Sequence, residues 1–324
     1  MKKQYLFGVF LALLTIGLVC CNKEDDRLLE INEITVDNYP RIDGSSSTEP
    51  LNTLIACKLL GWGYEWRPYS HGNGIWRLEP IGEEIPDNFF EERIKSSQTH
   101  NAIINLIDNR TDMIISARKM SADEKTYADN LGVSLIETPI ALDALDFLVN
   151  KQNTINSLTV QQVQDIYGGN ITNWNKLGGD NETIKPFIRN PNSGSQEMMK
   201  EIVMGNAEMP DWEVGYTDDE VISTMASVYS ELSVFQNGIC FSPHYYKEYI
   251  IREAVGAGNI KTIAIDGISP DENSIKNKTY PFVANVYVSI RSDMNHSSMT
   301  YKLYEWLQTE AGKRVISESG YVPN

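Results

Sequence analysis

The sequence predicts an α/β fold with mainly parallel sheets, and two observations favour it. Short apolar segments typical of buried strands alternate with segments whose apolar residues recur at helical spacing. No internal repeat and no low-complexity tract interrupts this alternation. The chain has 324 residues, of which 41% are hydrophobic, which is enough for two domains of ordinary size with buried cores.

The N-terminus has the pattern of a secretory signal. A charged start is followed by the apolar run 5–21, which is short for a transmembrane helix. Its end, Leu18-Val19-Cys20-Cys21, resembles the lipobox of bacterial lipoproteins, so we expect a signal peptide at 1–20 and a lipid on Cys21. Cys20 departs from the small residue usual there, and a plain signal peptide followed by a free cysteine is the alternative.

A polar tether is expected at 21–38, and the acidic stretch "NKEDD" follows directly after Cys21. This stretch resembles the surface-export signal of Bacteroidota lipoproteins, although a solvated spacer is the plainer interpretation. We therefore expect an extracytoplasmic lipoprotein of the cell envelope, on either the periplasmic or the outer-surface face of a membrane.

The elements of the folded part follow in order. Residues 39–48 predict a short strand and a Gly/Ser turn before a helix that starts at Glu49, and 61–85 predict a hairpin or a loop-rich excursion. Thr99 is a good N-cap for the next helix, which leads into a strand at 112–116. Further helices are expected at 121–132, 159–169, 195–205, 218–228 and 299–319. Further extended segments are expected at 134–150, 184–190, 238–246, 260–265 and 280–290.

The stretch "RNPNSGSQEMM" at 189–199 combines an arginine with a Ser-Gly-Ser cluster that opens a helix. The first backbone N–H groups of a helix lack intrahelical partners, and the helix dipole is positive there. Glycine allows a close approach, the serines donate, and the guanidinium fork of Arg189 matches an oxyanion. The alternative is an ordinary cap at Ser193 or Ser195 with Arg189 exposed.

Composition excludes several other classes. A net charge of −16 and a pI near 4.7 argue against nucleic-acid binding. Cys57 and Cys240 stand in apolar surroundings and predict buried thiols without a disulfide. No cluster has metal-ligand spacing and no nucleophile has a partnered base, so we expect no metal, no cofactor and no enzymatic activity.

Several stretches together resemble the phosphate-binding protein of bacterial phosphate ABC transporters, in the periplasmic binding protein type II superfamily. They are "GSSSTEPL", "SSQTHNAIINLIDNRTDMIISAR", "PIALDALDFLVN", "LTVQQVQDIYGGNITNWNKLGG", "RNPNSGSQ" and "SGYVPN". The resemblance covers roughly residues 40 to 324 and implies a monomeric two-lobed Venus-flytrap fold with two crossing strands. Lobe 1 would comprise 39–145 and 285–324, and lobe 2 would comprise 146–284.

This resemblance implies capture of inorganic phosphate between helix N-termini of both lobes, for delivery to an ABC permease. Carried over residue by residue, it implies a binding site made of Ser47, Thr48, Thr99, Arg189, Ser193, Gly194 and Ser195.

One position departs from the family pattern. Ala117 stands where an aspartate would accept the proton of the ligand, which distinguishes phosphate from sulfate. Asp143 is a candidate replacement, Arg118 could add charge or pair with an acid, and His100 could donate to the ligand or be an ordinary satisfied polar residue. The alternatives are therefore another oxyanion or an organic phosphate, or a surface receptor or adhesion module without a transport role.

Overall fold

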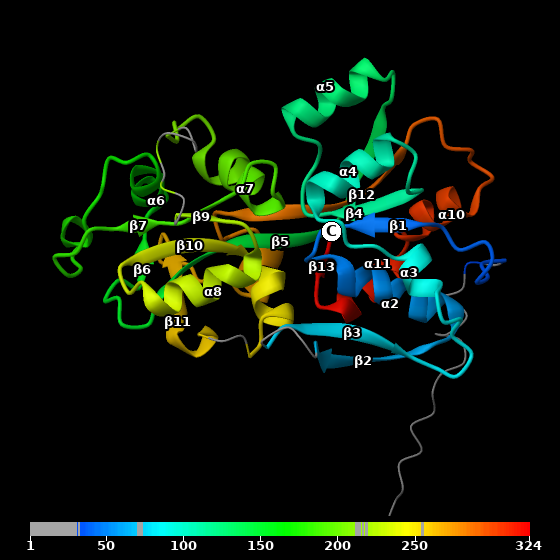
Figure 1. Cartoon of the computed structure of the whole chain (residues 1–324), viewed down its shortest axis with the longest axis horizontal. Helices are drawn as coiled ribbons and strands as arrows, with labels where there is room; N and C mark the ends of the chain where they lie inside the picture. The colour runs from blue at the N-terminus through cyan, green and yellow to red at the C-terminus, as the bar shows by residue number, and fades with distance from the viewer. Residues whose placement is uncertain are drawn as a thin grey trace, which may run out of the picture.

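The computed structural model describes residues 31, 33–69, 74–210, 215, 217, 220–253 and 256–324. The expected signal peptide at 1–20, the lipid acceptor Cys21 and most of the tether 21–38 lie outside these residues. Among the helices of the described ranges, none has both the length and the apolar composition of a membrane span. Figure 1 shows two lobes joined by long central strands, with the C-terminus where the lobes meet.

One large sheet runs through both lobes, in the order β1-β4-β12-β5-β10-β7, with β11 and β13 also paired to β5 and β6 paired to β11. Its strands are β1 (Ile42–Gly44), β4 (Met113–Ser116), β5 (Leu135–Asn150), β6 (Ser157–Leu158), β7 (Lys185–Pro186), β10 (Gly238–Pro243), β11 (Ile260–Ile265), β12 (Val283–Arg291) and β13 (Val322–Pro323). Two small sheets are formed by β2 (Gly63–Pro68) with β3 (Trp76–Ile81), and by β8 (Ile188–Arg189) with β9 (Val221–Ile222).

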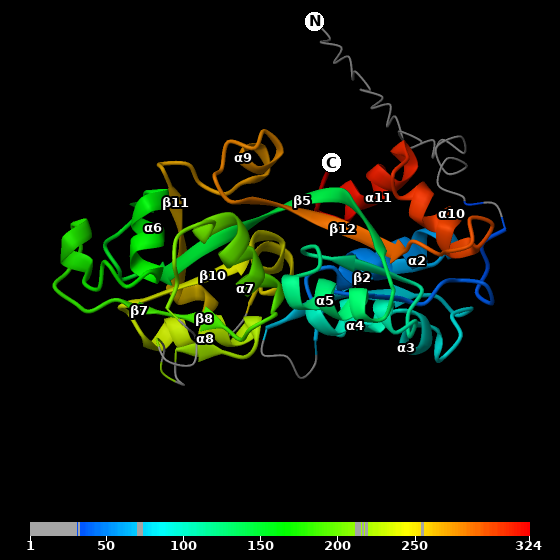
Figure 2. The same ribbon diagram turned by 90° about the horizontal axis from the view of Figure 1, so that it is seen from above.

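The expectation of mainly parallel sheets is wrong. β1 pairs with β4 in parallel, and so does β7 with β10. The long strand β5 is antiparallel to all of β10, β11, β12 and β13. The reason is topological: the chain enters the second lobe along β5 and returns along β12, so the two crossing segments run in opposite directions. Figures 1 and 2 show β5 and β12 side by side between the lobes.

Helices cover both faces of the sheet. They are α2 (Glu49–Leu60), α3 (Phe89–Arg93), α4 (Thr99–Ile107), α5 (Ala122–Asn130), α6 (Val160–Tyr167), α7 (Gly194–Met198), α8 (Met225–Val234), α9 (Glu272–Lys276), α10 (Met299–Trp306) and α11 (Glu310–Ser319). Short 3₁₀ turns form η1 (Trp174–Leu177) and η4 (Ala257–Asn259), and π-helical turns form η2 (Met199–Met204) and η3 (Tyr246–Ile250).

Three helix boundaries differ from the sequence prediction because of local capping. The helix expected at 218–228 begins only at Met225, where the Thr224 side chain accepts from Ser227 N. The long C-terminal helix is two helices, because Thr309 caps α11 through Gly312 N. Thr99 is the first residue of α4 and not its cap, which is Gln98 with a φ of 69°.

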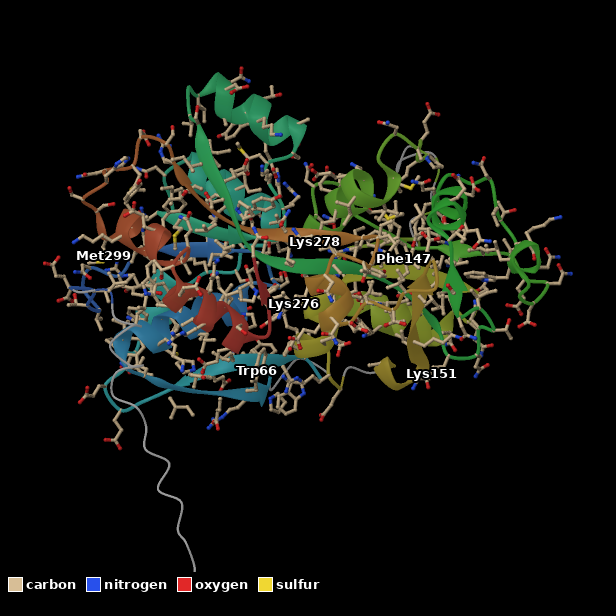
Figure 3. The ribbon with its side chains drawn as sticks, turned by 180° about the vertical axis from the view of Figure 1, so that it is seen from behind. Trp66, Phe147, Lys151, Lys276, Lys278 and Met299 are labelled. Atoms are coloured by element: carbon tan, nitrogen blue, oxygen red, sulfur yellow. The ribbon has the colours of Figure 1, made fainter. Side chains whose placement is uncertain are left out.

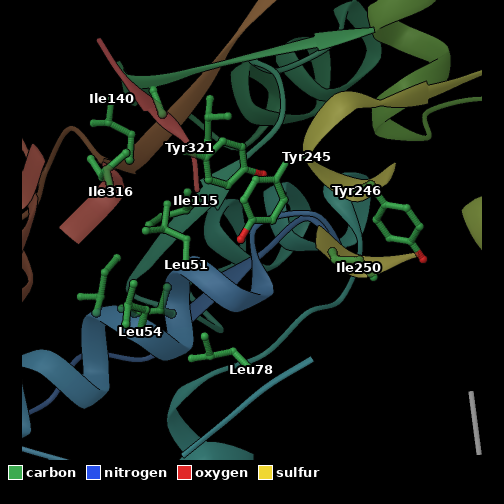
Figure 4. Packing of buried hydrophobic residues seen from close by; sticks show 14 of the residues in the cluster. Leu51, Leu54, Leu78, Ile115, Ile140, Tyr245, Tyr246, Ile250, Ile316 and Tyr321 are labelled. Atoms are coloured by element: carbon green, nitrogen blue, oxygen red, sulfur yellow. The ribbon is translucent and has the colours of Figure 1, made fainter. Parts of the chain in front are cut away.

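The core of the first lobe forms where α2 and α11 pack against the central strands. Figure 4 shows Leu51 and Leu54 of α2 near Ile115 of β4 and Ile316 of α11. This cluster continues into the second lobe through Tyr245 and its neighbours, so no gap in the core marks the expected lobe boundary at 145. The boundaries at 145 and 285 therefore stay predictions.

A second core surrounds Phe147 of β5, which Figure 3 labels from behind. Its ring contacts Tyr167, Phe241 and Phe282, with ring centroids 5.6–6.3 Å away. The cysteines Cys57 and Cys240 are buried and free, as the apolar sequence around each predicts.

Candidate functional site

A small cavity of about 110 Å³ lies between the two lobes, where several helices begin. Most of its lining residues are polar, and a single charged side chain is among those that the structure describes. The lining residues are Ser45, Ser46, Ser47, Gln98, Thr99, Ala117, Arg189, Ser193, Gly194, Ser195, Thr224, Met225, Pro243 and Tyr246. The cavity therefore brings together six of the seven residues carried over from the family resemblance.

Four helix N-termini supply the polarity of this cavity. The turns before α2 and α4 come from the first lobe, and the starts of α7 and α8 come from the second. Ser193 caps α7 by accepting from Gln196 N, as one sequence alternative had it, and Thr224 caps α8. Because each helix start presents unpaired N–H groups and partial positive charge, the four together favour an anion in the cavity.

Arg189 is the charged group of the cavity. It is only 5% exposed, so the alternative of an exposed arginine is wrong. Nε donates to Ile222 O at 2.7 Å, and Nη2 donates to Ser223 O at 3.0 Å. Nη1 reaches Ser195 Oγ at 3.3 Å. The end of β9 and the residue after it thus hold one side of the guanidinium, while Nη1 contacts Ser195, which lines the cavity.

The buried charge of Arg189 has no carboxylate partner among the described residues. Burial lowers the pKa of its guanidinium, and the groups that oppose this shift are Cys240 and Tyr246 rather than any acid. An unpaired buried cation is costly, and a bound anion would offset that cost. The buried positive charge therefore favours the binding of an anion in the cavity.

Hydroxyl groups of the first lobe form a chain toward the cavity. Ala117 N donates to Ser45 Oγ at 2.9 Å, and Ser45 Oγ lies 2.8 Å from Thr99 Oγ1. Only one of the two hydroxyl hydrogens, that of Ser45 or that of Thr99, is used in the contact between them. The other hydroxyl can therefore donate to a ligand.

The two lobes touch at the cavity. A Cβ placed on Gly194 would lie 2.4 Å from Thr99 Oγ1, across the cleft. Only glycine fits there, and its role is the close approach of the lobes rather than an unusual φ.

A second set of contacts holds the lobes together beside the cavity. Arg118 forms a bidentate pair with the buried carboxylate of Glu124 at 2.7 and 2.9 Å, so it pairs inside the protein and not on the surface. Its Nη2 also donates to Asn192 O at 3.0 Å, and Asn192 Nδ2 donates to Asp123 Oδ2 at 2.8 Å. The bond from Asn192 joins the loop before α7 to α5, and the bond from Arg118 joins the same loop to the segment before α5, so the two lobes contact each other beside the cavity.

Two of the expected ligand groups are committed elsewhere. Thr48 Oγ1 donates to Ile115 O at 2.7 Å and approaches Ser45 O at 3.0 Å, and the residue is fully buried outside the cavity lining. Its hydroxyl secures the turn to β4 and cannot also donate to a ligand. His100 Nδ1 contacts Glu124 Oε1 at 2.7 Å, which is the ordinary polar role that the sequence left open.

Asp143 does not replace the aspartate missing at Ala117. It lines a different cavity, behind the crossing strands, and its Oδ1 accepts from Ala144 N and Tyr245 N. Burial raises its pKa to about 6. Ala117 itself lies in the cavity wall, and no carboxylate is present among the described residues that line the cavity.

Sequence reasoning missed several lining residues. Ser45 and Ser46 belong to a loop that was already recognised, and Gln98 precedes Thr99. Thr224 falls within the helix expected at 218–228, so the sequence did not identify it as a helix cap. No sequence pattern marks Tyr246, because its ring reaches the cavity only through the packing of η3. Figure 4 shows this ring turned away from Tyr245. Burial raises the pKa of Tyr246 to about 12.

Comparison with known proteins identifies relatives of this chain. Protein SphX of Synechococcus elongatus is 23% identical over 271 residues, which are 78% of this chain and 76% of SphX. The phosphate-binding protein PstS of Pseudomonas aeruginosa is 26% identical over 228 residues, which are 64% of this chain and 66% of PstS.

A solved structure shares the fold. It is a candidate phosphate ABC transporter substrate-binding protein with bound phosphate from Clostridium perfringens, with a TM-score of 0.59 and 18% identity over 88% of this chain and 99% of that one. The family described as PBP superfamily domain matches residues 75–311, which is more than half of the chain. The chain belongs to the PBP superfamily.

Proposed function

We propose that the protein is an extracytoplasmic binding protein that captures inorganic phosphate between its lobes and delivers it to an ABC permease. The observation that carries the proposal is the buried guanidinium of Arg189, which faces four helix N-termini and has no acid beside it in the described residues. The names of its relatives, which include phosphate-binding proteins, support phosphate as the ligand. As in those relatives, its role is binding and not catalysis.

The proposed donors come from both lobes. Arg189 Nη1 would form a charge-assisted bond, and the hydroxyls of Ser47, Thr99, Ser193 and Ser195 would bond the remaining oxygens. The backbone N–H of Gly194 would contribute from the start of α7. A ligand held in this way bridges the lobes and favours the closed form.

The size of the cavity limits the ligand. About 110 Å³ is well below the roughly 300–1,000 Å³ of sites for drug-sized molecules. A cavity of this size favours a single tetrahedral ion over a nucleotide or sugar phosphate. The absence of a carboxylate among the described lining residues favours a second candidate, another tetrahedral oxyanion such as sulfate or molybdate, because nothing there repels an unprotonated ligand.

Titration calorimetry of residues 22–324 with phosphate, sulfate and molybdate tests the proposal. We expect saturable binding of phosphate, together with a smaller radius of gyration in solution scattering as the open form closes. A preference for sulfate or molybdate would keep the oxyanion site and change its ligand. No heat with any of the three ions, and superimposable scattering curves, would refute the proposal.

We further propose that a lipid on Cys21 anchors the protein, with the polar segment 22–38 as a spacer. Replacing Cys21 with alanine is expected to move the protein from the membrane fraction to the soluble fraction, because the anchor is lost. Fractionation after detergent-free lysis measures this, and Cys20→Ala serves as the matched control. If Cys20→Ala releases the protein and Cys21→Ala does not, the lipid is on Cys20 and the cleavage site lies one residue earlier.

A further inference from the structure

The turn at 45–48 supplies one wall of the proposed phosphate site. Ser45, Ser46 and Ser47 all line the cavity between the lobes, and the backbone N–H groups of Ser46 and Ser47 have no acceptor among the described residues. These N–H groups and the serine hydroxyls can bond an oxyanion only while the turn holds them toward the cavity. The contacts that fix this turn therefore also fix donors of the site.

Most anchors of this turn are local or come from β4. Ser45 N and Thr48 Oγ1 both donate to Ile115 O, at 3.2 and 2.7 Å, and Thr48 N donates to Ser45 O at 3.0 Å. A further anchor comes from the far end of the chain, because the Tyr321 hydroxyl donates to Ser47 O at 3.0 Å. Ser47 is 4% exposed, and its carbonyl has no other partner in the described part of the chain. Losing the Tyr321 hydroxyl would therefore leave this buried carbonyl unpaired.

The ring of Tyr321 contacts the second lobe. It stacks on the ring of Tyr245, the residue before η3, with ring centroids 3.8 Å apart and an interplanar angle of 6°. Figure 4 shows these two rings side by side. The Tyr245 hydroxyl donates back to Ser319 O at 2.9 Å. Both rings are buried in the core that continues from one lobe into the other.

The segment around Tyr245 reaches the same cavity as the turn. Pro243, which ends β10, and Tyr246, which begins η3, both line it. Tyr245 lies between them and donates its backbone N–H to Asp143 Oδ1 on the crossing strand β5, at 3.0 Å. Tyr321 thus contacts a wall of the cavity in each lobe, the turn through its hydroxyl and the segment before η3 through its ring.

The neighbours of Tyr321 fix its place without help from its hydroxyl. On one side β13 pairs with β5, with Val322 opposite Leu142. On the other side Gly320 has a φ of 103°, and a Cβ there would lie 2.4 Å from Tyr249 Cζ, so only glycine allows this close approach to η3. A variant that lacks only the hydroxyl is therefore expected to keep the stacked ring in place.

We propose that Tyr321 is a positioning residue of the phosphate site, an inference that rests on the proposed function. Its hydroxyl holds the turn at 45–48 in the conformation that presents donors to the anion, and its ring holds Tyr245 and with it the second-lobe wall. Tyr321 does not line the cavity, so it acts through the groups that it orients. Donors that are already ordered bind an anion more tightly, because less conformational freedom is lost on binding.

Tyr321→Phe tests this proposal, because it removes the hydroxyl and keeps the ring. We expect it to weaken phosphate binding about threefold to tenfold in titration calorimetry. The matched control is Tyr280→Phe, since the buried Tyr280 hydroxyl also donates to a backbone carbonyl at 3.0 Å, that of Leu145 on β5, and neither residue lines the cavity. The control is expected to lose a similar amount of thermal stability and to keep the wild-type affinity. Because Leu145 is on a crossing strand, it also reports what a general loosening between the lobes does.

A double variant shows whether Tyr321 acts through the turn. Ser47→Ala removes a donor that the turn presents, so an effect transmitted through this donor becomes smaller in its absence. Tyr321→Phe combined with Ser47→Ala is therefore expected to bind phosphate at least about twofold more tightly than the product of the two single losses predicts. A merely structural role would lower the melting temperature and leave this coupling at zero.

Circular dichroism confirms that each variant is folded before its affinity is measured. Equal phosphate affinity in the Tyr321→Phe and Tyr280→Phe variants would overturn the proposal, and so would losses in the double variant that simply multiply. Either result, with phosphate still bound by the wild-type protein, removes Tyr321 from the site and leaves the proposed function standing. If the wild-type protein binds none of phosphate, sulfate and molybdate, the proposed function is refuted and this inference with it.

Discussion

Replacing Arg189 with alanine is expected to weaken phosphate binding by about tenfold to several hundredfold. A charge-assisted hydrogen bond to a buried anion contributes about 1.5–3 kcal/mol, and more when its loss leaves the anion unpaired. Each 1.4 kcal/mol is about tenfold in the dissociation constant. Arg189→Lys is expected to recover only part of the affinity, because a point charge cannot bond Ile222 O, Ser223 O and the ligand together.

The variant also loses two bonds to backbone carbonyls of the second lobe, so some loss of stability is expected as well. Arg93→Ala is therefore the matched control, because Arg93 likewise donates to two backbone carbonyls, Tyr39 O and Asp37 O, far from the cavity. Calorimetry well below both melting temperatures separates affinity from stability. Equal phosphate affinity in the Arg189→Ala and Arg93→Ala variants would remove Arg189 from the site.

The sequence was most informative where the chemistry of the site is local. Arg189, Ser193, Gly194 and Ser195 lie within seven consecutive residues, and the capping pattern that marks a helix start also marks the donors that a helix start offers. The turn before α2 could be recognised for the same reason. The place of those residues in the site could be predicted without knowledge of the tertiary structure.

The predictions failed where a partner comes from a distant segment. Thr48 could not be distinguished from Ser47 by pattern, because the carbonyl that takes its hydroxyl belongs to Ile115, 67 positions away. Asp143 sits on a strand with neighbours on both faces, and its sequence does not say which cavity it faces. Tyr246 reaches the site only by packing.

Strand direction was the other failure. The apolar runs at 134–150 and 280–290 could be identified as strands, but a buried strand has the same apolar composition whether its neighbour is parallel or antiparallel. Only the crossing of the chain between the lobes makes β5 and β12 antiparallel.

Replacing Gly194 with alanine is expected to block closure and to weaken phosphate binding by roughly fivefold to a hundredfold. The added Cβ would lie 2.4 Å from Thr99 Oγ1 in the other lobe, and forcing such overlap costs about 1–3 kcal/mol. Stability of the open form is expected to hold, because position 194 is helical, its φ is not positive, and alanine favours a helix over glycine by about 1 kcal/mol.

Gly258→Ala is the control for this effect, since a Cβ there meets open space and its φ is not positive either. The double variant Gly194→Ala with Thr99→Ala removes the obstructing hydroxyl, so it is expected to close better than Gly194→Ala alone, although it lacks one donor to the ligand. Scattering with saturating phosphate measures closure, and calorimetry measures affinity. Wild-type affinity together with a closed scattering profile in the Gly194→Ala variant would show that the lobes do not approach each other at this glycine when the ligand is bound.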